Sequence, residues 1–139
     1  MQAVILAGGL GTRLQPYTFF IPKPMLPLGN KPLLEYLVEW VKQLKNIDEV
    51  IICVSYLHRT IEDYFEDGGR FGIKISYAHS ERPLATAGQL KTAEKMLKDR
   101  FLCLYGDSIY DFDLAKMVQE HEESKAFLSM ALMKYKTKM

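Results

Sequence analysis

The 139-residue chain predicts an α/β fold, a mainly parallel sheet with helices on both faces. Two observations carry this prediction. Segments with strand patterns and segments with helical periodicity alternate along the chain, and the order β-α-β-α-β-α-β-α-β implies parallel strands joined by right-handed crossovers. Residues 49–54 form a nearly continuous apolar run, as expected of a strand that is covered on both faces. The length suffices for one domain with its own core.

The first half of the chain supplies two strands and one helix. Residues 3–6 are apolar and predict a buried strand, which a long loop follows. Asn30 is expected to cap a helix that has Pro32 in its first turn. Apolar residues then recur at helical spacing and give this helix one apolar face. They are Leu33, Leu37, Trp40, Val41 and Leu44. The apolar run at 49–54 is the second strand.

The second half continues the alternation. A short helix over 59–67 ends at the stop signal Gly68-Gly69. Residues 73–77 alternate apolar and polar side chains, which indicates a strand that is partly buried or near an edge of the sheet. The strand at 101–105 has the most buried pattern after the first strand. The remaining expected elements are a helix over 89–98, a helix over 114–122 with Asp113 as its N-cap, and a last strand over 126–133.

The last strand carries a prediction about assembly. If the sheet ends at residues 126–133, that strand has an unpaired edge and an exposed apolar surface. The surface would consist of Phe127, Leu128, Met130 and Leu132. We therefore expect oligomers, including a homo-oligomer, or low solubility.

Composition limits the partners and the compartment. The formal net charge of +1 gives no basic field, so we expect no nucleic-acid and no membrane partner. No apolar run approaches the ~18–20 residues of a membrane span, and no signal peptide is visible. Cys53 and Cys103 lie mid-strand in apolar surroundings without the spacing of a zinc site, which favours a reduced, cytoplasmic protein. His58, His79 and His121 are scattered and show no metal spacing.

The most distinctive stretch is the loop at 7–32, which holds three glycines within four positions and five of the six prolines. Its G-G-x-G-T-R fits neither the dinucleotide fingerprint nor the Walker A pattern, but consecutive backbone N–H groups can nest an anion. Arg13 can fork onto phosphate oxygens, and Lys23 is held between two prolines as a point charge. Because long loops in compact domains are usually functional, we predict a phosphate-binding loop. The alternative is a Gly/Pro-rich turn with solvated charges.

Two later loops carry further candidates. Asp107 follows Gly106 at the end of a strand, where a carboxylate can hold Mg²⁺, and the alternative is a turn-capping Asp. The loop at 80–88 ends in small residues that suit a flat base or sugar, and the alternative is a plain turn capped by Thr86. Tyr105 is interpreted as a core residue. Because ligands bind outside the carboxyl ends of parallel strands, we expect the three loops to share one site.

These motifs together resemble the sugar-phosphate nucleotidyltransferases, also called nucleoside-diphosphate-sugar pyrophosphorylases. The resemblance covers all 139 residues and is closest in pattern to the mannose 1-phosphate guanylyltransferases. It depends on A-G-G-L-G-T-R-L-Q-P-Y-T and P-K-P-M-L-P-L-G-N-K-P within 7–32, P-L-A-T-A-G-Q-L at 83–90, and Y-G-D at 105–107. It implies a Rossmann-like fold of the nucleotide-diphospho-sugar transferase type. The implied reaction joins a nucleoside triphosphate and a sugar 1-phosphate, with GTP and mannose 1-phosphate preferred, and releases pyrophosphate.

The resemblance also implies a role for each matching residue. Arg13 and Lys23 would be catalytic: Arg13 would stabilise the β/γ-phosphates and the leaving pyrophosphate, and Lys23 would neutralise the α-phosphate or the sugar phosphate. Asp107 would ligate the Mg²⁺ cofactor. The backbone of 8–12 would wrap the triphosphate, and residues of the first two loops would border the base and ribose. The implied nucleotide-binding residues are Leu6, Ala7, Gly8, Gly9, Gly11, Thr12, Arg13, Glu81, Pro83 and Gly88.

Two departures from the family pattern matter. Ala85 stands where family members commonly have the first glycine of P-L-G-T-A-G, and a Cβ there could narrow the pocket. Family catalytic domains also continue into a half that binds the sugar and supplies a second metal carboxylate. We therefore expect residues 1–139 to be the N-terminal nucleotide-binding part of a truncated domain, with the sugar-binding remainder absent and full turnover not expected.

Two other functions stay open at this point. One is a glucose 1-phosphate uridylyl- or thymidylyltransferase, because the base is chosen only on the pattern at 81–88. The other is a non-catalytic regulatory or assembly module with the same fold. Retention of the glycine loop together with Arg13, Lys23 and Asp107 argues against the non-catalytic module.

Overall fold

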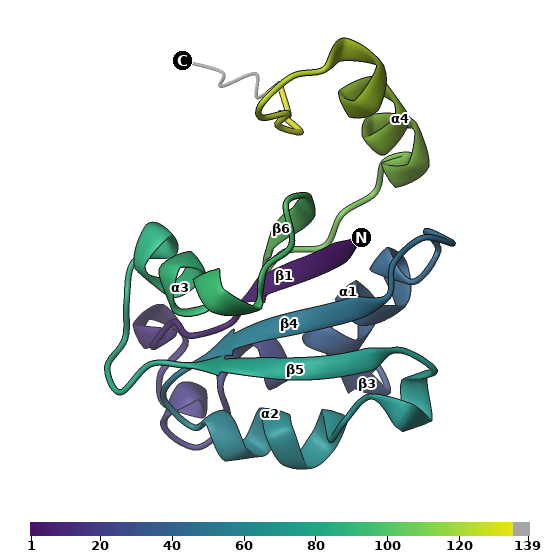
Figure 1. Ribbon diagram of the computed structural model, residues 1–139. Helices are drawn as coiled ribbons and strands as arrows, with labels where there is room; N and C mark the ends of the chain where they lie inside the picture. Colours follow the sequence, from purple (N-terminus) through teal and green to yellow (C-terminus); the bar gives the residue numbers. More distant parts are fainter. Residues whose placement is uncertain (135–139) are drawn as a thin grey trace, which may run out of the picture.

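The structure is a computed structural model that describes residues 1–134 of the chain. Its main sheet holds four parallel strands in the order β5-β4-β1-β6, so the first strand lies inside the sheet (Figure 1). The strands are β1 (Gln2–Leu6), β4 (Glu49–Val54), β5 (Lys74–His79) and β6 (Phe101–Tyr105). A short antiparallel hairpin in the first loop pairs β2 (Pro27–Leu28) with β3 (Lys31–Pro32).

Helices and 3₁₀ turns connect the strands. The α-helices are α1 (Leu33–Val41), α2 (His58–Phe65), α3 (Thr86–Thr92) and α4 (Leu114–Ser124). The 3₁₀ turns are Thr12–Leu14, Tyr17–Phe19, Lys23–Met25, Gly69–Phe71 and Glu94–Met96. No helix in the described part of the chain is both long enough and apolar enough to span a membrane.

Helices cover both faces of the sheet, because successive strand residues point to opposite faces. Ala3 and Ile5 of β1 pack in one core with the apolar faces of α1 and α2. Val4 and Leu6 pack in a second core, together with Leu90 of α3. Figure 1 shows α3 on one side of the sheet and α1 and α2 on the other. The predicted α/β class, with a parallel sheet and helices on both faces, is confirmed.

The strand order explains which strands are buried. Residues 50–54 of β4 are all buried, because β4 lies between β5 and β1. The edge position expected for 73–77 is confirmed in β5. The prediction that 101–105 is the most buried strand after the first is wrong. Among the described residues β6 pairs with β1 alone, and Cys103 and Tyr105 are exposed.

The predicted last strand at 126–133 is also wrong, since these residues form no strand in the structure. Helix α4, of which only Leu114 is buried, leads the chain away from the sheet (Figure 1). The segment therefore has no neighbouring strand to complete a ladder of hydrogen bonds. Its apolar side chains are exposed as expected, namely Phe127, Leu128, Met130 and Leu132. Self-association through them stays a prediction.

The start of α1 differs from the prediction. Asn30 caps no helix. It lies with Gly29, at φ +70°, in the two-residue turn of the β2–β3 hairpin. The chain then stays extended at Pro32, and α1 begins at Leu33. A Gly-Asn pair between two paired residues is itself a hairpin signal, which competed with the capping signal.

The later helices agree with the prediction more closely. Helix α2 and helix α4 lie within two residues of their predicted bounds. Asp113 caps α4 as predicted, because its carboxylate accepts a hydrogen bond from the Lys116 N–H at 2.9 Å. Helix α3 differs from the predicted 89–98 at both ends, because it begins at Thr86 and ends at Thr92, before a 3₁₀ turn. Ala85 rather than Thr86 occupies its N-cap position, without a side-chain hydrogen bond.

Candidate functional site

A pocket of about 310 Å³ lies at the carboxyl ends of the strands, within the range of ligand sites. The loops after β1, β5 and β6 all line it, as predicted. The chain runs from β1 outward to β4 and β5 and then returns to β6 on the other side of β1. The strand order therefore reverses between β1 and β6, which is where α/β sheets bind ligands.

The first loop is shaped by a close contact at Gly11. This residue has φ +61°, and a Cβ there would lie 2.9 Å from Cγ2 of Thr18. The buried Thr18 hydroxyl donates a hydrogen bond of 2.8 Å to the Gly11 carbonyl, which fastens the turn. Arg13 follows in an exposed 3₁₀ turn and lines the pocket. The glycine is thus required by both backbone conformation and packing.

The strand end at β6 carries the carboxylate of the site. A Cβ at Gly106 would lie 2.9 Å from the carbonyl oxygen of Leu6, so β6 can approach β1 this closely only with glycine there. The Gly106 N–H donates to that same carbonyl at 2.9 Å. Asp107 is the next residue, and the paired backbone before it fixes its position at the mouth of the pocket.

Lys23 and Asp107 form an ion pair across the pocket, with Nζ and Oδ2 2.6 Å apart. The two side chains are 32% and 41% exposed, so a ligand can reach both of them. Sequence reasoning gave them separate partners, a phosphate and a metal ion. The structure shows that the lysine and the aspartate, 84 residues apart, contact each other directly.

Gln89 joins the first loop to the second. Its Oε1 accepts a hydrogen bond from the Gly8 N–H at 2.9 Å, and its Nε2 donates one of 3.0 Å to the Leu84 carbonyl. The Gly8 N–H is therefore already occupied in this structure. Sequence reasoning quoted Gln89 in a motif but gave it no role, because only the fold brings it to Gly8.

The pocket gathers most of the predicted site residues. Those that line it are Leu6, Ala7, Gly9, Gly11, Thr12, Arg13, Lys23 and Asp107. Gly8, Glu81 and Pro83 lie in the surrounding loops without lining it, and Gly88, which lies in α3 rather than in the expected loop, does not line it either. Lining residues without a predicted role are Leu14, Pro24, Leu84, Thr86, Gln89 and Tyr105. Ala85, the departure from the family pattern, lines the pocket as well.

Tyr105 corrects the interpretation of that residue as part of the core. It ends the edge strand β6, and the residue is 53% exposed and lines the pocket. Behind it, Tyr110 accepts a hydrogen bond from the Tyr105 N–H at 2.9 Å. Burial raises the pKa of Tyr110, so this hydroxyl stays neutral at physiological pH.

The two cysteines are free thiols. Cys53 is buried as predicted, and burial raises the pKa of its thiol to about 11. Cys103 is exposed, contrary to the prediction of apolar surroundings. Neither lines the pocket.

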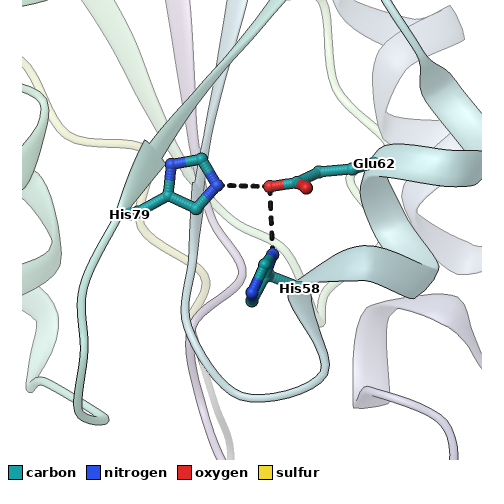
Figure 2. Close-up of side chains that lie close together, drawn as sticks. All are labelled: His58, Glu62 and His79. Atoms are coloured by element: carbon teal, nitrogen blue, oxygen red, sulfur yellow. Dashed lines mark hydrogen bonds and ion pairs between the residues drawn. The ribbon is translucent and has the colours of Figure 1, made fainter.

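The histidines also correct an expectation. His58 and His79 come together on either side of Glu62 rather than being scattered (Figure 2). Burial alone would raise the pKa of the Glu62 carboxyl, but the hydrogen bonds from His79 and His58 outweigh it and lower that pKa. His121 lies apart on α4, where its Nδ1 is 2.9 Å from the Ser129 hydroxyl.

Known proteins are similar to this chain over most of its length. The family model described as nucleotidyl transferase matches residues 2–139. A D-glycero-α-D-manno-heptose 1-phosphate guanylyltransferase of Campylobacter jejuni is 44% identical and covers 96% of this chain and 58% of its own length. A UTP–glucose-1-phosphate uridylyltransferase of Synechocystis is 39% identical, with coverage of 94% and 36%. A mannose-1-phosphate guanylyltransferase catalytic subunit beta of Xenopus tropicalis is 41% identical, with coverage of 88% and 35%.

Solved structures show the same fold. The crystal structure of HddC from Yersinia pseudotuberculosis complexed with GMP-PN superposes with a TM-score of 0.75 at 32% identity, covering 86% of this chain and 53% of that one. The chain thus spans about a third to three fifths of the length of these proteins.

Proposed function

The chain belongs to the nucleotidyl transferase family, and on that premise we propose that it transfers a guanylyl group from GTP to a sugar 1-phosphate, releasing pyrophosphate. The observation that carries the proposal is the pocket at the β1–β6 switch point, where two cations and one carboxylate meet a glycine-rich loop. This set matches a triphosphate with a bound cation better than it matches a neutral ligand.

The nucleotide is proposed to lie with its phosphates along the first loop and its base toward the second. Backbone around Gly9 and Gly11 supplies N–H groups, and the exposed Arg13 guanidinium reaches the phosphates that leave. Leu84 and Ala85 offer an apolar wall for the base. The Cβ of Ala85 forms part of that wall.

The chemistry requires positioning and charge neutralisation. An anionic oxygen of the sugar phosphate attacks the α-phosphorus, the bond to the β-phosphate oxygen breaks, and pyrophosphate carries the negative charge away. Lys23 neutralises charge at the attacked phosphate, and Arg13 neutralises it on the leaving group. No proton has to be removed from the nucleophile, so the step needs no general base.

The residues present fit a magnesium ion. Mg²⁺ in nucleotide sites binds through one or two carboxylates plus phosphate oxygens, and Asp107 is the carboxylate that lines the pocket. When bound, the ion would supply charge neutralisation on the triphosphate. Asp107 would hold it, and Lys23 would release its ion pair with Asp107 to contact phosphate instead.

The choice of base and sugar draws on the relatives. The proteins similar to this chain include guanylyltransferases for heptose and mannose 1-phosphates, which share the manno configuration. Mannose 1-phosphate is therefore our preferred acceptor, and we propose that the protein makes GDP-sugars in the cytoplasm. The uridylyltransferase at 39% identity supports UTP and glucose 1-phosphate as the second candidate pair.

The division of labour is part of the proposal. The relatives are longer, and we propose that residues 1–139 hold the nucleotide while further sequence of the kind found in the relatives selects the sugar. Titration of GTP, UTP, dTTP, ATP and CTP in the presence of Mg²⁺ tests the base, and tightest binding of UTP or dTTP would overturn the guanylyl proposal. Full turnover by the 139-residue chain would overturn the division of labour.

A further inference from the structure

Outside the pocket, three side chains able to ligate a metal converge on one point (Figure 2). They are His58 and Glu62 of α2 and His79, the last residue of β5. One ligand atom of each residue lies within 4.8 Å of the other two. Glu62 Oε1 is 3.2 Å from His58 Nδ1 and is hydrogen-bonded to His79 Nε2.

Regular secondary structure holds the three side chains in place. His58 and Glu62 stand four residues apart on α2, a spacing that puts both on one face of a helix. That face lies beside the carboxyl end of β5, and Figure 2 shows His79 directed toward Glu62 from the strand. The cluster therefore depends on two regular elements rather than on a flexible loop.

The cluster is accessible to an ion. The side chains of His58 and His79 are 41% and 53% exposed, and that of Glu62 is 26% exposed. A cation can therefore enter from solvent, and water has room to complete its coordination. A metal-binding side chain buried in a dry core would have neither an entry path for the ion nor room for the coordinating water.

We propose that His58, Glu62 and His79 form a binding site for a first-row transition-metal cation, with Zn²⁺ as the expected occupant. Two imidazoles and one carboxylate are an established three-ligand set for zinc, with water in the fourth position. Tetrahedral bonds of about 2.0–2.1 Å place ligand atoms roughly 3.3 Å apart, which small side-chain rotations reach from the observed positions. Mg²⁺ prefers oxygen ligands and is expected to be excluded.

The bound ion would join the first turn of α2 to the end of β5. The loop at 80–88, which leads to the pocket wall, begins directly after His79. The metal would thus fix the point from which this loop starts. Because the folded chain presents all three ligands together and the unfolded chain does not, binding stabilises the fold.

The test uses the 139-residue chain without a polyhistidine tag. Calorimetric titration with ZnCl₂ is expected to show one high-affinity site per chain, and a tenfold excess over the Kd is expected to raise the Tm by about 5 °C. Without nucleotide, MgCl₂ at the same concentration is expected to change neither heat nor Tm, because Asp107 is paired with Lys23 and lacks the phosphate oxygens that would complete its magnesium site. Equal binding of both cations, or no binding of Zn²⁺, would overturn the proposal.

Three variants and one matched control locate the site. His58→Ala, His79→Ala and Glu62→Gln are each expected to weaken Zn²⁺ binding at least tenfold, because even second-sphere changes commonly cost that much. His121→Ala removes the remaining histidine of the chain and is expected to bind like the parent. Metal-free melting curves check that each variant folds. If one of the three variants does not fold, the other two decide whether these residues bind the zinc. Parent-like affinity in those variants, or a loss in His121→Ala, would place the zinc elsewhere.

Discussion

At the amino end of the sheet, Gln2 is 1% exposed, and its amide bonds Glu49, the Met96 carbonyl and the Lys98 N–H. At the carboxyl end, Lys23 and Asp107 pair with each other while staying open to the pocket. Both ends therefore carry polar side chains, but one set is enclosed by protein and the other faces a cavity. Strand β1 connects them, because it begins with Gln2 at the amino end and leads to the pocket at the carboxyl end.

The difference assigns the two ends to different tasks. An enclosed, fully bonded polar group stabilises the fold and costs free energy when a partner is removed. An accessible charged group contributes little to stability and is available to a ligand. Substitutions at the amino end should therefore lower the Tm, and substitutions at the carboxyl end should lower nucleotide affinity.

The largest effect is expected from Arg13→Ala at the carboxyl end. Charge-assisted hydrogen bonds contribute about 1.5–3 kcal/mol, so affinity for GTP with Mg²⁺ should fall about 10- to 100-fold. The Tm should stay unchanged, because Arg13 is exposed. Titration calorimetry and melting curves measure the two quantities. Arg59→Ala removes an exposed arginine of α2 that does not line the pocket, and an equal loss of affinity there would break the comparison.

The largest loss of stability is expected from Gly68→Ala, near the amino end of β5. The residue has φ +86°, and a Cβ would lie 1.9 Å from the carbonyl oxygen of Ile73. Backbone strain and overpacking together should cost about 3 kcal/mol, a fall in Tm of roughly 10 °C. Gly9→Ala is the matched control, because nothing lies within 4 Å of its Cβ position. Equal destabilisation by both variants would show that the contact is not the cause.

A smaller loss of stability is expected from Gln2→Ala. The change leaves the Met96 carbonyl and the Lys98 N–H without their partner, which should cost about 1–3 kcal/mol in unfolding free energy. Nucleotide affinity should stay within about twofold, because Gln2 lies at the opposite end of β1 from the pocket. Urea denaturation measures the cost, with the exposed Gln43→Ala as control. If Gln2→Ala lowered nucleotide affinity without lowering stability, the amino end of the sheet would serve binding rather than stability, and the comparison would be wrong.

The smallest effect concerns acid sensitivity at Glu49. Burial alone would raise the pKa of this carboxyl, but hydrogen bonds from Lys74, Ser76 and Gln2 lower it below the ordinary 4.5. Its contribution to stability is therefore present above about pH 4.5 and is lost as pH falls through the lower folded value. Melting curves from pH 6 to 3 should show the parent losing more stability than Glu49→Gln. Parallel pH profiles would contradict this.

Local patterns predicted the sheet well where packing and periodicity agree. The apolar run at 49–54 became the buried β4 with the predicted bounds, and the alternation at 73–77 marked an edge strand. Residues 101–105 and 126–133 have similarly apolar patterns, yet one is half-exposed and the other forms no strand. Their burial depends on which segments lie beside them, and local sequence does not encode that.

The site too combines features that local sequence predicts with features that only the fold creates. Arg13, Lys23 and Asp107 are recognisable from residue type and neighbouring glycine or proline, and the structure brings all three to one pocket. The Lys23–Asp107 pair could not be predicted, because its members are 84 residues apart and meet only in the folded chain. In the Glu62 cluster, the four-residue spacing of His58 and Glu62 is a local signal, but only the fold brings His79 to them.

Gln89 has a consequence for the dimensions of the pocket. Its amide spans from the Gly8 N–H to the Leu84 carbonyl, so the length of one side chain sets the spacing between two walls. The gap therefore depends on residue 89 as well as on the strands beneath it. A shorter side chain of the same chemistry, as in Gln89→Asn, would bring the walls together or break the bridge. A change at this uncharged residue would therefore alter the size of ligand that the pocket accepts, without touching its cations or its carboxylate.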